Sequence, residues 1–305
     1  MFSKSIIFSQ DMKFRNLYKY LKQRFPIINM VLFAILFLTV YSVAHFFNPI
    51  QTDNLHLLDF LGIVACIFFF FRLRVFDEIK DYDMDLNNHP GRILQSGQIT
   101  LKELKAIAVV GTFIEIAWSF SMGLPTLLAW LAAFSFSVLM RYEFFISSFL
   151  KKILLVYAIS HMLIMPLIIL WIWIAYSPAI NSGYYLLALL SLLGGFSFEL
   201  ARKIHSADAE KATVDSYSKS MGLIASIAAV LGVLGVGIAV LSYLLLVIHA
   251  SLYSFLIIGL LYFATIILYL LIINKPQEKQ LRVAEILVSL FMLISYLSVI
   301  IEINF

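Results

Sequence analysis

Acidic side chains gather in two short segments of this chain. Half of its 18 Asp and Glu residues fall in residues 77–85 and 199–215. The first acidic segment (77–85) contains Asp77, Glu78, Asp81, Asp83 and Asp85, and the second (199–215) contains Glu199, Asp208, Glu210 and Asp215. Carboxylate oxygens are the ligands that Mg²⁺ takes in proteins. The two acidic segments are therefore the first candidates for a reactive site.

The spacing within the first acidic segment suits a shared metal ion. Asp77, Asp81 and Asp85 recur every four residues. In a helix this spacing places three side chains on one face over about 12 Å. Like charges so placed destabilise a helix, but Mg²⁺ reverses the effect because it bridges carboxylates to substrate phosphates. We interpret the three aspartates as metal ligands, and the alternative is a solvated acidic loop.

Basic side chains are interleaved with the acids in both segments. They are Arg72, Arg74, Lys80 and Arg92 around the first, and Arg202, Lys203, Lys211 and Lys219 around the second. A metal ion neutralises a diphosphate while arginine binds its oxygens in pairs. Tyr82 is a further candidate for contact with the diphosphate. The pattern predicts an amphipathic substrate with a diphosphate at these loops and a hydrocarbon tail among apolar helices.

The rest of the chain has the composition of a membrane protein. Hydrophobic residues make up 62% of its 305 residues and charged residues 13%, whereas soluble domains average roughly 45–50% and about 25%. This excludes a soluble enzyme and a disordered chain, and the single cysteine excludes a disulfide scaffold. Long continuous apolar runs indicate membrane helices, not the alternating pattern of a barrel. The predicted fold class is an all-α polytopic membrane protein.

Nine apolar runs approach the roughly 20 residues that a transmembrane helix needs. They are residues 27–47, 57–76, 104–122, 124–140, 153–175, 184–204, 223–247, 252–273 and 283–301. All 22 Lys and Arg residues lie before the first run or at the connections after the second, fourth, sixth and eighth. Because basic residues stay on the cytoplasmic side, we expect a cytoplasmic N-terminus. Both acidic segments then form a cytoplasmic cap over a central cavity.

Residues 1–25 are expected to form a basic amphipathic segment before a single transmembrane domain at residues 26–305. Basic residues alternate there with Phe14, Leu17, Tyr18 and Leu21. This pattern is typical of a helix lying on an anionic leaflet, and the alternative is a solvated basic tail. Within the spans, Glu115 and His161 are ionisable. Each is expected either to line an acceptor cavity or to hydrogen-bond between helices.

From about Pro26 onward, the sequence resembles the UbiA-type intramembrane prenyltransferase superfamily. Its members have nine transmembrane helices and aspartate-rich motifs after helices two and six. The first family motif, Asn-x3-Asp-x3-Asp, is similar to Asp77-x3-Asp81-x3-Asp85, with Asp in place of Asn. An Arg-Pro-like stretch and a glycine turn follow the motif in the family. They are matched here by Arg92-Ile93-Leu94 and Gly97.

The second family motif is less well matched. Members carry an upstream acid and then Asp-x3-Asp. An overlay without gaps puts Glu199 on the upstream acid, Ser206 on the first Asp and Glu210 on the second. Asp208 lies between these positions and is the alternative ligand if the loop shifts. One expected aspartate is therefore missing.

The resemblance implies a Mg²⁺-dependent prenyltransferase in a membrane, the inner or cytoplasmic one if the source is bacterial. Its substrates would be a prenyl diphosphate and a lipophilic acceptor, usually an aromatic ring. The implied catalytic residues are Asp77, Asp81, Asp85, Glu199, Asp208 and Glu210, with Asp77, Asp81, Asp85, Asp208 and Glu210 as metal ligands. Beyond membrane lipid, we expect no nucleic acid and no obligatory protein partner.

Other functions are compatible with parts of this pattern. The same fold could belong to a terpene cyclase or to another isoprenoid-phosphate transferase. A membrane transporter is the alternative from another class. It would need polar residues at mid-membrane on several helices, whereas the acids here cluster at one end of the predicted spans.

Overall fold

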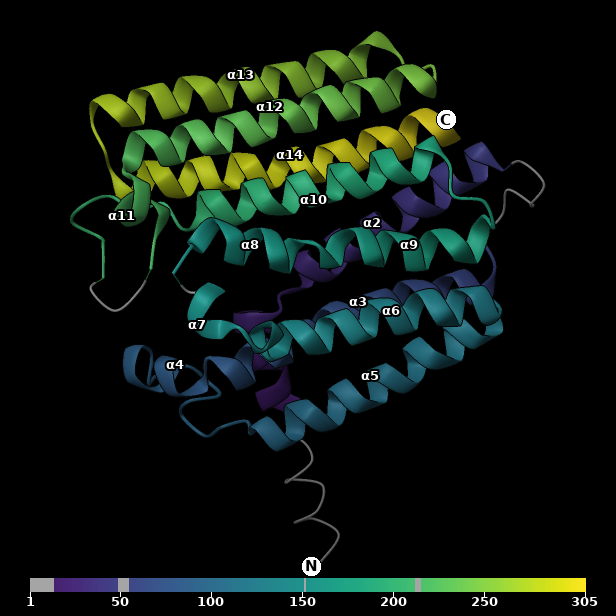
Figure 1. The fold of residues 1–305 in the computed structure, drawn as a ribbon, viewed down its shortest axis with the longest axis horizontal. Helices are drawn as coiled ribbons and strands as arrows, with labels where there is room; N and C mark the ends of the chain where they lie inside the picture. Colours follow the sequence, from purple (N-terminus) through teal and green to yellow (C-terminus); the bar gives the residue numbers. More distant parts are fainter. Residues whose placement is uncertain (1–13, 49–54, 151, 212–214) are drawn as a thin grey trace, which may run out of the picture. The chain divides into compact units, whose positions relative to one another are not determined.

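The structure, a computed structural model, describes residues 14–48, 55–150, 152–211 and 215–305. These residues form helices and no β-strand, which confirms the all-α prediction (Figure 1). The helices are α2 (Ile27–Phe47), α3 (Leu57–Lys80), α4 (Tyr82–Asn88), α5 (Leu101–Ser121), α6 (Leu124–Arg141), η1 (Glu143–Phe145, a 3-10 helix), α7 (Ser147–Leu150), α8 (Leu154–Met162), α9 (Ile164–Tyr176), α10 (Ser182–Arg202), α11 (Tyr217–Met221), α12 (Leu223–Val247), α13 (Leu252–Asn274) and α14 (Glu278–Asn304). Residues 14–24 are helical as well.

Within the described ranges, eight segments are long and apolar enough to cross a membrane, so the protein is a multi-pass integral membrane protein. The predicted second span lies in α3, which carries Asp59, Arg72 and Arg74 and is not among these eight. The count of nine spans, their orientation and a cytoplasmic cap therefore remain predictions.

The predicted fifth span is interrupted where α8 ends and α9 begins. Leu163 separates the two helices. Pro166 lies in the first turn of α9, and it has no N–H to donate to the carbonyl of Met162, four residues earlier. A proline is tolerated in a first turn because the amides there lack intrahelical partners. The proline explains why one apolar run forms two helices.

The chain divides into two compact units. The first comprises Met1–Phe37 and Asn54–Leu127, and in it α3 packs along α5. Two glycines permit this close approach: a Cβ on Gly111 would lie 2.4 Å from Cδ1 of Phe68, and one on Gly62 would lie 2.6 Å from the rings of Phe37 and Trp118. A capping box starts α5, in which the Thr100 hydroxyl accepts from the Glu103 amide and the Glu103 carboxylate accepts from the Thr100 amide.

The helical residues 14–24 pack on a hydrophobic cluster of the first unit. Tyr20 is fully buried in this cluster with Phe71 and Val75, and Leu17 and Leu21 pack against it. Phe14 and Tyr18 are 73% and 68% exposed. One apolar face of this segment therefore binds the protein itself. Contact of the exposed aromatics with a membrane surface stays a prediction, and residues 1–13 lie outside the described residues.

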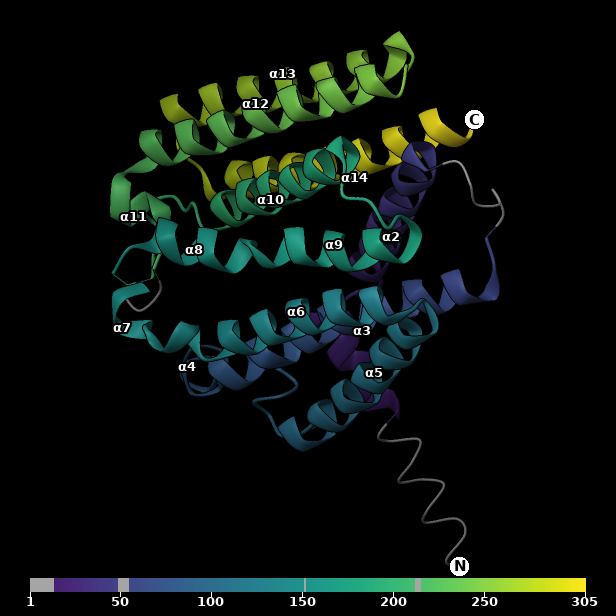
Figure 2. The same cartoon turned by 45° about the vertical axis from the view of Figure 1, so that its right-hand side comes forward.

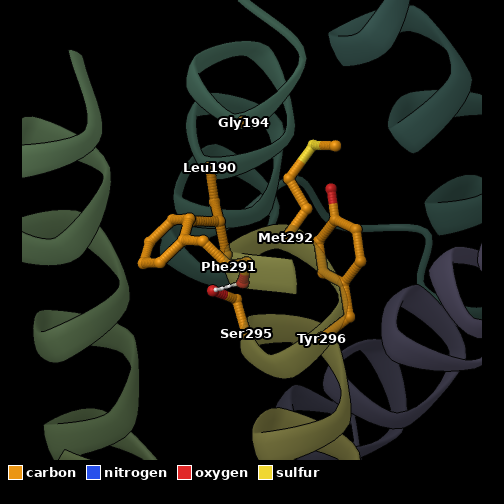
Figure 3. Close-up of a pocket in the computed structure, with 6 residues that line it drawn as sticks. All are labelled: Leu190, Gly194, Phe291, Met292, Ser295 and Tyr296. Carbon is orange, nitrogen blue, oxygen red and sulfur yellow. Dashed lines mark hydrogen bonds between the residues drawn. The ribbon is translucent and has the colours of Figure 1, made fainter. Parts of the chain in front are cut away.

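The second unit comprises Leu38–Asp53 and Leu128–Phe305. Helix α10 contacts α8, α9, α12 and α14, and α13 packs on α12 and α14 (Figures 1 and 2). Gly194 of α10 faces Met292 of α14, where an added Cβ would lie 3.0 Å from Cγ. Figure 3 shows the small hollow beside them, which Phe291 and Tyr296 also line. It has no room for a water molecule, so it belongs to the packing between α10 and α14.

Candidate functional site

The first acidic segment joins the end of α3 to α4. The Asp81 amide donates to the Asp77 carbonyl (2.9 Å), and the Asp85 amide donates to the Asp81 carbonyl (2.8 Å). Helical hydrogen bonding therefore continues through the three aspartates, although Asp81 itself (φ −97°, ψ 8°) separates the two helices. The four-residue spacing in the sequence is thus retained as successive helical turns.

The three aspartates differ in their environments. Asp85 is buried, and its Oδ2 lies 2.5 Å from Nη1 of Arg92 and 3.4 Å from Nη2 of Arg24. The Asp77 side chain is half exposed and lies 3.5 Å from Nζ of Lys80. Asp85 is therefore neutralised by two guanidinium groups, whereas Asp77 remains open to solvent.

The surroundings of Asp81 disfavour its charged form. Burial raises its pKa, Lys80 and Arg74 lower it, and the neighbouring Asp77 and Asp85 raise it further, so that the pKa lies above its usual value. A raised pKa means that the charged carboxylate is disfavoured in this environment. A bound cation would relieve that unfavourable charge.

Glu78 is a residue of this site to which the sequence analysis assigned no role. It is 1% exposed, and its Oε1 accepts from Nε of Arg24 (2.7 Å) and Nη2 of Arg74 (2.8 Å). Its Oε2 is buried without a hydrogen-bond partner among the described residues. The Arg74 contact follows the i, i+4 helical spacing, but nothing local in the sequence points to Arg24.

Two other predicted diphosphate ligands lie in different surroundings. Arg72 is buried between α3 and α5, with Nη2 2.9 Å from Oε2 of Glu115 and its guanidinium 4.3 Å from the ring centre of Phe69. A diphosphate would have to replace this ion pair to reach Arg72. Tyr82 is partly buried against the hydrophobic cluster of the first unit. Of the two interpretations of Glu115, the structure supports the contact between helices, because Glu115 of α5 pairs with Arg72 of α3.

The second acidic segment begins in the last turn of α10. Glu199 is 7% exposed and pairs with Nε of Arg202 (2.5 Å) and Nζ of Lys203 (2.8 Å). After the helix, Asp208 is exposed in a turn in which the Ala209 amide donates to the Ser206 carbonyl.

Neighbouring hydroxyl groups orient the carboxylate of Glu210 in the second acidic segment. It accepts hydrogen bonds from the hydroxyls of Ser216 (2.7 Å) and Ser218 (2.5 Å). Burial raises its pKa, but these hydrogen bonds outweigh that effect and, with Lys219 3.6 Å away, hold the pKa below its usual value. Lys219 also donates to the carbonyl of Lys211. Glu210 is therefore ionised and oriented, and residues 212–214 of the same loop lie outside the described residues.

A residue far along the chain also reaches this segment. The Ser206 amide donates to Oε2 of Glu278 (3.0 Å), and Nδ1 of His205 lies 2.9 Å from Oε1 of Glu278. The sequence analysis missed Glu278 because it begins α14, 72 residues after Ser206.

The donor atoms of both segments have the chemistry that Mg²⁺ requires. Mg²⁺ takes oxygen ligands, usually one or two carboxylates together with substrate phosphates and water. Oε2 of Glu78 has no hydrogen-bond partner in the described part of the chain, and the pKa of Asp81 is raised. Both observations indicate that a cation bound near these carboxylates would be stabilised. Among the described residues, no three His, Cys, Asp or Glu side chains converge on one point. The fit thus rests on one or two carboxylates, as expected for an ion shared with a substrate.

These observations define a polytopic helical membrane protein with paired acids and cations at the ends of α3 and α10. The model of the UbiA prenyltransferase family matches residues 31–294. The chain therefore belongs to this family, as the resemblance of its motifs predicted, and is a membrane enzyme of the prenyl-transferring class. No curated protein sequence matches the chain.

Solved structures share the fold. A structure from a study of digeranylgeranylglyceryl phosphate synthase in membranes is 18% identical, with a TM-score of 0.67 over 95% of this chain and 99% of that one. The UbiA homologue from Aeropyrum pernix K1 is 16% identical, with a TM-score of 0.66 over 91% and 98%. The UbiA homologue from Archaeoglobus fulgidus bound to GPP and Mg²⁺ is 17% identical, with a TM-score of 0.54 over 92% and 99%.

Proposed function

We propose that this protein transfers a prenyl group from a prenyl diphosphate to a lipophilic, aromatic acceptor in a Mg²⁺-dependent reaction. The observation that carries the proposal is the first acidic segment, where aspartates on successive helical turns lie among arginines and one buried carboxylate oxygen has no partner. The family supports the reaction class. Two structures of the Archaeoglobus fulgidus homologue, bound to GPP or DMAPP with Mg²⁺, support both the donor and the cofactor.

Each segment is assigned carboxylates that bind Mg²⁺. Asp77 and Asp81 in the first, and Glu210 or Asp208 in the second, are the oxygen ligands with the most suitable surroundings. Bound Mg²⁺ supplies positive charge that stabilises the leaving diphosphate. Asp85 and Glu199, both already paired with basic side chains, hold those cations in place.

Basic residues bind the diphosphate, and apolar helices shield the reaction from water. Lysine and arginine side chains bind the diphosphate oxygens, and the proposed set is Arg74, Lys80, Arg92, Arg202, Lys203, Lys211 and Lys219. The allylic C–O bond breaks and its electron pair leaves on the diphosphate. The allylic cation then forms a C–C bond with the acceptor ring, which loses a proton. Apolar helices exclude the water that would otherwise quench the cation.

Incubation of purified protein with Mg²⁺, prenyl diphosphates of graded length and a lipid extract tests this function. We expect mass spectrometry to detect an acceptor whose mass increases by one prenyl group, and we expect chelation of Mg²⁺ to abolish the product. A cyclic hydrocarbon formed without acceptor would identify a cyclase instead. Absence of both products and of diphosphate release, at every chain length, would overturn the proposal.

A further inference from the structure

The first turn of α14 is attached to the beginning of the second acidic segment. Glu278 lies in this turn, and four polar atoms surround its carboxylate. Oε2 accepts from the amide (3.0 Å) and the hydroxyl (3.3 Å) of Ser206, and Oε1 lies 2.9 Å from Nδ1 of His205 and 3.0 Å from Nε of Arg282. A carboxylate has about four acceptor sites. Three of these contacts are hydrogen bonds from the loop, and Arg282 adds an ion pair in which its Nε makes no hydrogen bond to a described residue, so Glu278 acts on the loop and not on a metal.

Arg282 lies one helical turn later and binds the end of α10. Its Nη1 donates to the carbonyl of Arg202 (3.1 Å), and its Nη2 donates to the carbonyl of Ile204. Carbonyls at the end of a helix have no partner within that helix. The guanidinium fork supplies two donors in a fixed geometry, so Arg282 caps α10 while Glu278 binds the amide that follows.

Two of the three residues whose backbone groups this pair binds are deeply buried. Ser206 is 1% exposed and Ile204 is fully buried. A buried backbone group without a partner is costly, so the chain cannot leave α10 in another direction without losing these hydrogen bonds. Glu199 lies just before this exit and Glu210 just after it.

We propose that Glu278 and Arg282 are positioning residues for the second acidic segment. They fix the path of the chain between Glu199 and Glu210, and so hold its carboxylates ready for the metal and diphosphate. This inference rests on the function proposed above. Partners beyond the metal ligands commonly orient those ligands, and their loss weakens metal binding by about 10–100-fold. Helix α14 therefore contributes to the site as well as to the membrane domain.

The test measures binding of Mn²⁺, in place of Mg²⁺, to the full chain in detergent with a non-hydrolysable prenyl diphosphate. Electron paramagnetic resonance reports this binding without an acceptor or turnover. Glu278→Gln removes the charge and turns one oxygen into a donor that faces Arg282 or Ser206. We expect its Mn²⁺ affinity to fall by about 10-fold in a protein that elutes unchanged and still unfolds cooperatively.

Glu302→Gln is the matched control. Glu302 is also a carboxylate of α14 and accepts from the amide (2.9 Å) and hydroxyl (2.6 Å) of Ser251, at the other end of the helix. We expect its Mn²⁺ affinity to equal that of the unaltered protein. If Glu278→Gln unfolds, Arg282→Lys serves instead, because it keeps the charge but loses the fork. A purely structural role would lower the unfolding temperature of either variant and leave the Mn²⁺ titration of the folded protein unchanged, and that result overturns the inference.

Asp81→Asn in the same titration separates this inference from the function on which it rests. If Asp81→Asn weakens Mn²⁺ binding while Glu278→Gln and Arg282→Lys do not, the positioning role is wrong and the proposed function stands. If the unaltered protein binds no Mn²⁺ with the prenyl diphosphate, the proposed function and this inference both fail.

Discussion

The Arg72–Glu115 ion pair is the most deeply buried pair of charges described in the first unit. Arg72 is 2% exposed and Glu115 is fully buried. Two buried charges are tolerated because each compensates the other, and removal of one partner leaves the other uncompensated. The stability of the α3 and α5 pair therefore depends on the two charges being kept together or removed together.

Glu115→Gln should lower the free energy of unfolding by roughly 3–5 kcal/mol, because the charge of Arg72 loses its partner. Thermal unfolding in detergent measures this loss. The double variant Arg72→Met with Glu115→Leu should recover much of it, since apolar replacement of a buried pair is often neutral. A stable Glu115→Gln protein that no longer reacts with an acceptor would instead assign Glu115 to the acceptor cavity.

The raised pKa of Asp81 predicts how pH affects metal binding. Protons compete with Mg²⁺ for this carboxylate, so as pH falls the affinity for Mg²⁺ should begin to weaken at a higher pH than for an ordinary aspartate. Mn²⁺ titrations at a series of pH values measure this effect. Asp81→Asn should bind weakly at every pH, without that transition.

The same pKa has a consequence for stability without metal. Because the folded state raises the pKa of Asp81, the fold favours the protonated form, and this favourable contribution is lost as pH rises through the folded pKa. At neutral pH, metal-free Asp81→Asn should therefore unfold at the same temperature as the unaltered protein or above it. A lower unfolding temperature would show that the Asp81 carboxylate stabilises the fold.

At the scale of elements, glycine determines how closely α3 approaches α5. Gly111 of α5 lies against Phe68, with the Cβ of Phe68 only 2.8 Å from where a methyl group would lie. Because that atom is attached to the backbone of α3, it cannot swing away. The two helices would have to move apart to admit any side chain.

Gly111→Ala should therefore lower the free energy of unfolding by roughly 1–3 kcal/mol, the usual range for overpacking. Gly232→Ala in α12 is the matched control, because no atom lies within 4 Å of its added methyl group. There alanine should be neutral or stabilise by up to about 1 kcal/mol, since it favours helix more than glycine does. Equal unfolding temperatures for the two variants would contradict this packing argument.

At the scale of the whole molecule, the distribution of basic residues predicts the membrane topology. Nine spans with the N-terminus in the cytoplasm place Phe305 on the opposite side. A reporter that is active only in the cytoplasm should be inactive when fused after Phe305 and active when inserted in the connection between α13 and α14. Activity at Phe305 would mean that α3, which carries six charged residues, does not cross the membrane.

Local features of the sequence determined much of this protein. Apolar runs located the membrane helices because hydrophobic length is a property of a continuous stretch. The spacing of Asp77, Asp81 and Asp85 was likewise sufficient to predict successive helical turns. The break at Leu163 was predictable in principle from Pro166, although the continuous apolar run concealed it. The start of α14 was placed five residues late because its first turn is charged.

Only the tertiary structure decided which polar side chains meet across distant parts of the chain. Arg24 binds Glu78 across 54 positions, Arg72 binds Glu115 across 43, and Glu278 binds Ser206 across 72. Each basic or acidic residue had several possible partners at similar places in the sequence. Which of them meet depends on how helices distant in the chain pack together, and periodicity and composition carry no information about contacts at that range. Such a long-range contact also buries Asp85 against Arg24, alongside Arg92, whereas the ion pair of Asp77 with Lys80 is local and Asp77 is half exposed.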